Sequence, residues 1–245
     1  ENDIQEHMIM PVKFKTFSEA LRAGVEVYHE LGRLLKSKFG SHGILLGDEG
    51  GYVPKIDNVN ERLELISKAI ENIGYKNKIF LALDCAASEF FYSDYYKIGS
   101  KNYSPGELID FYKNLIKKYG IISIEDGMAE DDWNGWKQLN RELGSKIQIV
   151  GDDLLVTNSK RIDQAAKEKA CNALLLKVNQ IGTVTEAVEA ANLAFRNKWK
   201  VIVSHRSGET EDSFIADLVV GLNAGQSKFG APARSERTAK YNRLL

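Results

Sequence analysis

The sequence lacks the features that mark secreted, membrane-spanning and nucleic-acid-binding proteins. Its only cysteines, Cys85 and Cys171, belong to no CxxC or Cys/His motif, so we expect two reduced core thiols and no disulfide scaffold. No hydrophobic run approaches the roughly 20 residues of a membrane helix, and no signal peptide opens the chain, so we expect a cytoplasmic protein without a membrane span. The net charge of −1 provides no overall field for nucleic acid, so we expect no such partner.

The composition is that of an ordinary folded protein. Hydrophobic residues make up 43% and charged residues 27%, which favours a globular chain with a sizeable core over a disordered one. The length of 245 residues suits a single α/β barrel, and no Pro-rich or Ser-rich linker interrupts the chain, so we expect one domain over residues 1–245. The opening residues, ENDIQEHMIMP, do not begin with methionine, so we expect a segment of a longer polypeptide.

Several helix starts are marked by a hydroxyl residue followed three positions later by glutamate. Thr16–Glu19, Ser104–Glu107 and Thr183–Glu186 all fit the capping box, in which the two side chains satisfy the first free backbone N–H groups of a helix. We predict helices at residues 17–39, 59–73, 105–119, 131–143, 159–170, 184–197, 211–222 and 235–244.

Short apolar runs alternate with these helices. They are too short for helices and too continuously apolar for a sheet with one wet face, which favours parallel strands covered on both faces. The predicted strands end at Asp84, Glu125, Asp152, Lys177 and His205, and a further strand-like run covers residues 6–12. The alternation predicts an α/β fold built from βα units, as in a TIM-type (β/α) barrel.

Carboxylates end three of these strands. In a barrel of parallel strands the carboxyl ends converge on the active site, so Asp84, Glu125 and Asp152 would meet there although they are distant in sequence. Their hard anionic oxygens suit Mg²⁺, and without a cation the three charges would repel one another. For any single position the alternative is a helix cap or a turn residue. Asp153, beside Asp152, is either a residue that supports the metal ligands without binding the metal itself or a helix cap.

Lys177 follows the apolar run LLL, where neither capping nor turn formation calls for a lysine. Close to a metal ion it could lose its proton more easily and act as a general base. The alternative is a structural ion pair with one of the carboxylates. Lys228 is a further basic residue at a possible strand end.

Arg206 and Ser207 directly follow the last long apolar strand. A forked guanidinium and a hydroxyl suit a phosphate or another oxyanion. The alternative is that nearby acidic residues, such as Glu209, merely pair with Arg206 at the surface. Glu49 lies in GDEGG, a flexible Gly-flanked loop from which it could enter a site as an acid, although Asp and Gly are also typical of ordinary turns.

Seven motifs together resemble those of the enolase family, in the family's order and across nearly the whole chain. They are GDEGG, LDCAASEF, SIEDGMAEDDW, GDDLLVTN, LLLKVNQIGT, VSHRSGETED and GAPARSER. The resemblance implies the reversible dehydration of 2-phospho-D-glycerate to phosphoenolpyruvate in glycolysis and gluconeogenesis, catalysed by a hydro-lyase that requires Mg²⁺.

By matching position, the resemblance implies that the three strand-end carboxylates bind the Mg²⁺ ion. Lys177 corresponds to the base that removes the proton beside the substrate carboxylate. Glu49 corresponds to the acid that assists the departure of hydroxide, with Glu6 close by. The Mg²⁺ ion would stabilise the aci-carboxylate that forms when the proton is removed.

The same comparison implies how the substrate is held. Arg206 and Ser207 correspond to the phosphate-binding residues, and His205 lines the same pocket. Lys228 corresponds to a lysine that helps to bind the substrate carboxylate.

Compared with the family, the sequence contains neither the amino-terminal lid domain nor the first barrel strand, so we expect a barrel of the enolase kind without those parts. The family also implies a homo-oligomer, either a dimer or a larger ring. Two alternatives remain open: another member of the superfamily that acts on a different, unphosphorylated acid, and a non-catalytic binding protein that is displayed at the cell surface.

Overall fold

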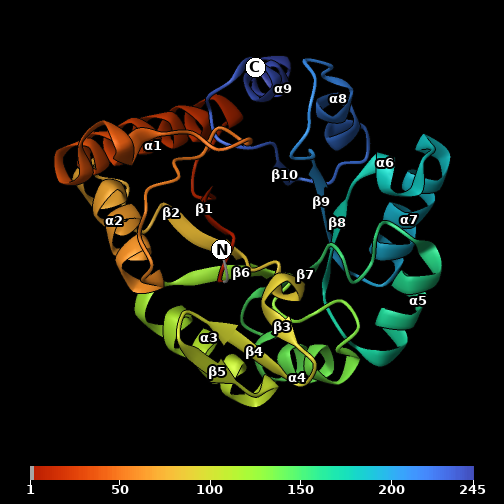
Figure 1. Ribbon diagram of the computed structural model, residues 1–245. Helices are drawn as coiled ribbons and strands as arrows, with labels where there is room; N and C mark the ends of the chain where they lie inside the picture. The colour runs from red at the N-terminus through yellow and green to blue at the C-terminus, as the bar shows by residue number, and fades with distance from the viewer. Residues whose placement is uncertain (1–2) are drawn as a thin grey trace. The chain divides into compact units, whose positions relative to one another are not determined.

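The computed structural model describes residues 3–245 and has an α/β architecture (Figure 1). The α-helices are α1 (Phe17–Phe39), α2 (Val59–Asn72), α3 (Pro105–Tyr119), α4 (Trp133–Leu143), α5 (Ser159–Glu168), α6 (Val178–Ile181), α7 (Val184–Arg196), α8 (Phe214–Gly221) and α9 (Ser235–Leu244). The strands are β1 (Glu6–Pro11), β2 (Ile79–Asp84), β3 (Phe91–Tyr92), β4 (Tyr95–Ile98), β5 (Lys101–Tyr103), β6 (Ile121–Glu125), β7 (Gln148–Gly151), β8 (Ala173–Leu176), β9 (Lys200–Ser204) and β10 (Ser227–Lys228). The 3-10 helices are η1 (Gly40–Ile44) and η2 (Ala87–Phe90).

The chain divides into two compact units. Of the described residues, unit 1 contains 3–8, 81–203 and 222–226, and unit 2 contains 9–80, 204–221 and 227–245. The expectation of a single domain over residues 1–245 stays a prediction.

Unit 1 is built on a parallel sheet. β2 pairs with β6, β6 with β7, β7 with β8, and β8 with β9, and every one of these pairs is parallel. The helices α3, α4, α5 and α7 lie on one side of these strands (Figure 1). The prediction of parallel strands from the apolar runs is therefore confirmed for the five long strands of this sheet.

The strands of unit 1 are buried because their side chains are mainly apolar. Val150, Ala173, Leu175 and Ile202, from three neighbouring strands, pack into one cluster. Complete burial of a Val, Leu or Ile side chain stabilises the fold by about 1.5–3 kcal/mol, so a few such residues hold each strand in place. The polar residues that end the strands are thus positioned by a rigid core.

Side-chain caps set the starts of the helices. The capping boxes predicted at Thr16 and Ser104 are both formed. At Thr183 the hydroxyl accepts the backbone N–H of Glu186, while its own O–H donates to the Glu186 carboxylate at 2.6 Å. Asp132 caps α4 through the N–H of Gly135, so this helix begins two residues later than predicted. α8 likewise begins at Phe214 instead of residue 211.

A small antiparallel sheet of β3, β4 and β5 was not predicted from the sequence. Its strands are only two to four residues long, too short for a clear alternating pattern. Tyr96 anchors this sheet: its buried hydroxyl donates to the Asp132 carboxylate at 2.8 Å and accepts the N–H of Ala129 at 3.0 Å.

In unit 2, α1 packs against α2, and α8 packs against α9. The loop around Glu49 was expected to be flexible, but backbone and side-chain bonds hold it. The Gly47 N–H donates to the Gly51 carbonyl at 2.9 Å, and the Tyr28 hydroxyl donates to the Gly50 carbonyl at 2.8 Å. Gly50 has a φ of 78°, and a Cβ at this position would lie 2.7 Å from the carbonyl oxygen of Ala233. Glycine is therefore required at this point in the loop.

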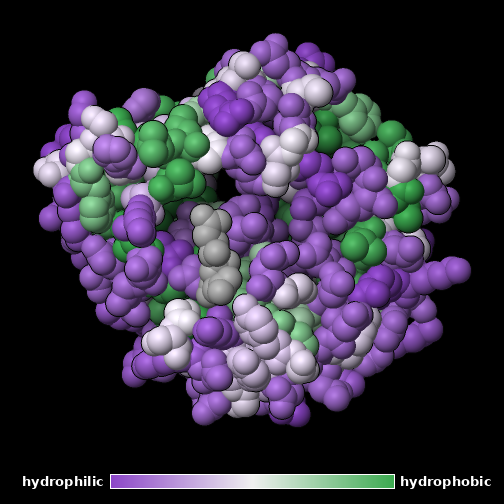
Figure 2. Space-filling view, viewed as in Figure 1, coloured by the Kyte–Doolittle hydropathy of each residue, from purple (hydrophilic) through white to green (hydrophobic). Residues whose placement is uncertain are grey.

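The molecular face seen in Figure 2 is mainly hydrophilic, with hydrophobic residues in small separate patches. Among residues 3–245, no helix has both the length and the apolar character that crossing a membrane requires.

Candidate functional site

The predicted metal ligands of unit 1 lie at the ends of neighbouring strands. Asp84 ends β2 and Glu125 ends β6, and their Cα atoms are register partners, so both side chains leave the same face of the sheet. Asp152 directly follows β7. All three residues are buried, with no more than 7% of any of them exposed. Their role as ligands stays a prediction.

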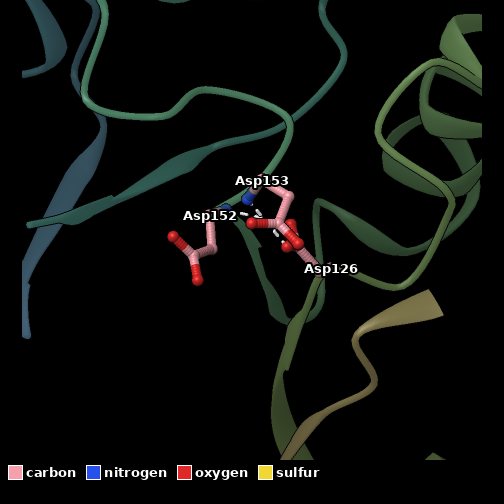
Figure 3. Close-up of side chains that lie close together, drawn as sticks. All are labelled: Asp126, Asp152 and Asp153. Carbon is pink, nitrogen blue, oxygen red and sulfur yellow. Dashed lines mark hydrogen bonds between the residues drawn. The ribbon is translucent and has the colours of Figure 1, made fainter. Parts of the chain in front are cut away.

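The carboxylates that lie closest together are those of Asp126, Asp152 and Asp153 (Figure 3). One oxygen from each lies within 4.8 Å of the others, and among residues 3–245 this is the group that could share one cation. The Asp126 carboxylate accepts the backbone N–H of Asp152 at 2.9 Å and that of Asp153 at 2.8 Å. Figure 3 shows the Asp152 side chain turned away from the Asp126 carboxylate. Asp84 and Glu125 lie outside this cluster of three.

The cluster carries more negative charge than its buried surroundings tolerate. Burial, together with the charges of Asp152 and Asp84, raises the pKa of Asp126 well above its usual range, although its two backbone N–H bonds oppose the shift. Burial and the charge of Asp152 also raise the pKa of Asp153, against the effect of Lys177. An oxygen-only donor set under this mutual repulsion fits a hard divalent cation.

Asp126 was missed in the sequence, although it directly follows Glu125 in SIEDG. It has a φ of 42°, in the left-handed region that aspartate tolerates better than most residues. The sequence did not predict this backbone turn. It also did not predict the two hydrogen bonds that Asp126 accepts from N–H groups of a segment beginning 26 residues later.

Lys177 follows β8 and pairs with Asp152. Its Nζ lies 2.5 Å from Oδ2 of Asp152, while Nε2 of Gln180 donates to the other carboxylate oxygen at 2.8 Å. Thr157 completes the network, because its hydroxyl accepts the Lys177 N–H at 3.0 Å and donates to Oε1 of Gln180 at 2.8 Å. The ion pair named as the structural alternative is present, and it also places the amine beside the acidic cluster.

Unit 2 brings together three of the other predicted site residues. The Ser207 hydroxyl donates to Oε1 of Glu49 at 3.1 Å. Nε2 of His205 lies 3.2 Å from Oε2 of Glu49, although the ring N–H is not aimed well enough for a hydrogen bond. Burial lowers the pKa of His205, assisted by the charges of Arg237 and Lys228 and opposed by Glu49. The histidine is therefore neutral near pH 7.

The segment that follows His205 is fixed by buried cations of α9. Arg237 and Lys240 are each only 1% exposed, and neither was identified from the sequence. Nζ of Lys240 contacts Oε2 of Glu209 at 2.9 Å and the carbonyl of Glu236 at 2.7 Å, and it also bonds the carbonyl of Thr210.

Glu209, named above as a surface partner of Arg206, has contacts with two other groups. Glu209 accepts the Lys240 ammonium and, at 3.2 Å, the backbone N–H of Arg206. Lys228 lies in β10, where its carbonyl accepts the His205 N–H at 3.0 Å. Glu6 is the first residue of β1 and is partly buried.

The whole chain matches one protein family. The model of the family described as "Enolase, C-terminal TIM barrel domain" matches residues 1–245. This description confirms the predicted fold class, a (β/α) barrel of the TIM type.

Several full proteins contain a closely similar segment. The chain is 56% identical over 249 residues to the enolase of Methanopyrus kandleri and 55% identical over 249 residues to that of Thermococcus gammatolerans. It is 53% identical over 251 residues to enolase 2 of Hevea brasiliensis. These alignments cover 99–100% of the chain but 56–58% of the relatives, so the chain spans less than two thirds of their length.

Proposed function

The chain belongs to the enolase family, and from this premise we propose that it carries the catalytic residues of a phosphopyruvate hydratase, which converts 2-phospho-D-glycerate reversibly to phosphoenolpyruvate. The observation that carries the proposal is the side-chain nitrogen of Lys177, 2.5 Å from Asp152 and beside the carboxylates of Asp126 and Asp153. A base next to a divalent cation site is what the removal of a very weakly acidic proton requires.

In unit 1 the proposed roles are metal binding and proton removal. Asp84, Glu125 and Asp152 would hold Mg²⁺, and Asp126 would support them by fixing the backbone of Asp152. When bound, Mg²⁺ supplies positive charge that stabilises the negative charge developing on the substrate carboxylate. Lys177 would take the proton from carbon 2 of the substrate as a neutral amine, after it has left Asp152 and released its own proton to solvent.

In unit 2 the proposed roles are substrate binding and proton donation. Glu49 gives a proton to the hydroxyl on carbon 3, which leaves as water while the electron pair left on carbon 2 forms the double bond. Arg206 and Ser207 bind the phosphate, and Lys228 helps to bind the carboxylate. His205 lines the phosphate pocket through its N–H. Glu6, a residue of unit 1, would assist Glu49 in the departure of the hydroxyl group.

The two proton transfers can be separated by experiment in the full chain. Lys177→Ala should abolish both phosphoenolpyruvate formation and the exchange of the carbon-2 proton with deuterated water, followed by proton NMR. Glu49→Gln should abolish dehydration but retain exchange, because it leaves the base in place. Lys167→Ala, which removes an exposed lysine of α5, is the matched control and should retain both activities.

Exchange that persists in Lys177→Ala would overturn its role as the base. Exchange lost equally in Glu49→Gln would show that Glu49 does more than donate a proton at the second step. Preferential turnover of an unphosphorylated acid would favour the alternative superfamily enzyme. Calorimetry that detects no Mg²⁺ binding would favour the non-catalytic binding protein.

The family relationship also supports proposals on location and assembly. We propose a cytoplasmic enzyme that acts as a homo-oligomer, either a dimer or a larger ring. Light scattering of the full chain tests the second point, and a monomeric mass under assay conditions would contradict it.

A further inference from the structure

Arg237 joins two backbone segments of unit 2, through three carbonyl groups, and the ring of His205. The guanidinium, buried within the unit, makes four contacts. Nη1 donates to the carbonyl of Arg206 at 2.7 Å and lies 2.6 Å from Nδ1 of His205. Nη2 donates to the carbonyl of Asp48 at 3.0 Å and to that of Ser207 at 2.6 Å.

The contact with His205 settles which ring nitrogen carries the proton. A guanidinium has only donors and stays protonated in proteins, so Nδ1 of His205 must accept through its lone pair. A neutral imidazole with a bare Nδ1 carries its proton on Nε2, and this is the nitrogen 3.2 Å from Glu49. The same ring could not donate from Nδ1 without a clash between two hydrogens.

We propose that Arg237 is a positioning residue that fixes His205 as the neutral tautomer with its proton on Nε2. Its other bonds hold the carbonyls of Arg206 and Ser207 and the carbonyl of Asp48, the residue before Glu49. One buried cation thus determines which ring nitrogen is protonated. It also holds in place the backbone that carries the proposed phosphate-binding and acid groups. The inference deepens the proposed function, but the tautomer can be measured without any turnover.

Three charged groups act on the ring, and they come from different segments. Glu49 lies on the GDEGG loop, Lys228 on β10 and Arg237 on α9. Glu49 favours a charged ring, whereas burial and the two cations disfavour it. Of these groups, Arg237 is the one that contacts Nδ1, so it can favour one neutral tautomer of His205 over the other.

The experiment is ¹⁵N NMR of the full chain at neutral pH, with ¹⁵N-labelled histidine. His205→Asn identifies the two ring signals of residue 205, and their chemical shifts report which nitrogen is protonated. Arg237→Gln replaces the donor-only group with an amide that can donate or accept, and Arg237→Lys keeps a donor-only cation. Arg234→Gln is the matched control: it removes the same charge three residues earlier, from a side chain that contacts Glu236 and the carbonyl of Gly47.

The wild-type protein and Arg234→Gln should show an unprotonated Nδ1 and a protonated Nε2. Arg237→Gln should lose this pattern and gain a population with the proton on Nδ1, and Arg237→Lys should restore the wild-type pattern. A wild-type ring protonated on Nδ1 would overturn the proposal without reference to any variant. So would folded Arg237→Gln protein with an unchanged tautomer. Loss of proton exchange in Lys177→Ala is independent of all these outcomes, so failure of this inference and failure of the proposed function are distinguishable.

Discussion

Replacing Lys177 with methionine tests how strongly the acidic cluster depends on its neighbouring amine. Methionine keeps the apolar stem and removes the ammonium that lies 2.5 Å from Asp152. The two side chains are 16% and 10% exposed, so water screens the pair only weakly. Removing one partner of a buried ion pair costs about 3–5 kcal/mol, because it leaves a charge uncompensated.

Uptake of a proton by the carboxylate that has lost its partner sets an upper limit on this loss of stability. Protonating an ordinary aspartate at pH 7 costs about 4 kcal/mol, at 1.36 kcal/mol per pH unit above a pKa near 3.9. Once the cost of the unpaired charge exceeds this limit, the carboxyl takes up a proton instead. We therefore expect a loss of about 3–4 kcal/mol at pH 7 and of no more than about 1.5 kcal/mol at pH 5.

The free energy of unfolding should be measured in urea at both pH values, with a chelator present so that no divalent cation replaces the ammonium. Lys167→Met is the control, because its pair with Asp163 has a similar distance of 2.6 Å but exposed side chains, and such pairs contribute about 0–1 kcal/mol. If Lys177→Met cost no more than Lys167→Met, or if its cost did not shrink at pH 5, the argument from burial would be refuted.

Three further perturbations follow from described contacts. Tyr96→Phe removes a buried hydroxyl with two partners and should lower the free energy of unfolding by about 2 kcal/mol in urea titration; an unchanged midpoint would contradict this. Gly50→Ala should lower the stability of the protein by roughly 2 kcal/mol or more, and it should also reduce phosphoenolpyruvate formation. Gly24→Ala, in the open interior of α1, should raise the stability by up to about 1 kcal/mol. Thermal unfolding measures both changes in stability. The lowered pKa of His205 means that the unfolded chain takes up its proton first as the pH falls. The contribution of His205 to stability is therefore complete above pH 6.5 and is lost below it. The difference in the free energy of unfolding between wild type and His205→Asn should narrow from pH 7 to pH 5, and a constant difference would contradict this prediction.

The strand ends of unit 1 could be predicted because their signal is local. A mainly apolar run followed by an acidic residue marks both the buried strand and its end, as at Asp84 and Glu125. Asp152, Lys177 and His205 lie one residue beyond their strands, a shift that changes neither their order nor their placement after a rigid element. Burial of the run dominates, so the prediction succeeds without knowledge of tertiary contacts.

The supporting residues could not be predicted, because their partners are backbone groups from distant segments. In the sequence SERTAK, Arg237 and Lys240 look like exposed residues of a polar helix, yet both are buried against carbonyls about 30 residues earlier in the chain. Asp126 is a similar case, since it accepts N–H groups from a neighbouring strand end. Backbone partners leave no trace in side-chain patterns.

The two buried cations of α9 have a consequence for the synthesis of the chain. Ribosomes add residues from the amino end, so the segment from His205 to Thr210 is made about 30 residues before the side chains that fasten it. Until Arg237 and Lys240 have been added and α9 has formed, the carbonyls of that segment lack these ligands. A nascent chain could thus complete its core strands and still lack an ordered loop, which would become ordered only when α9 docks.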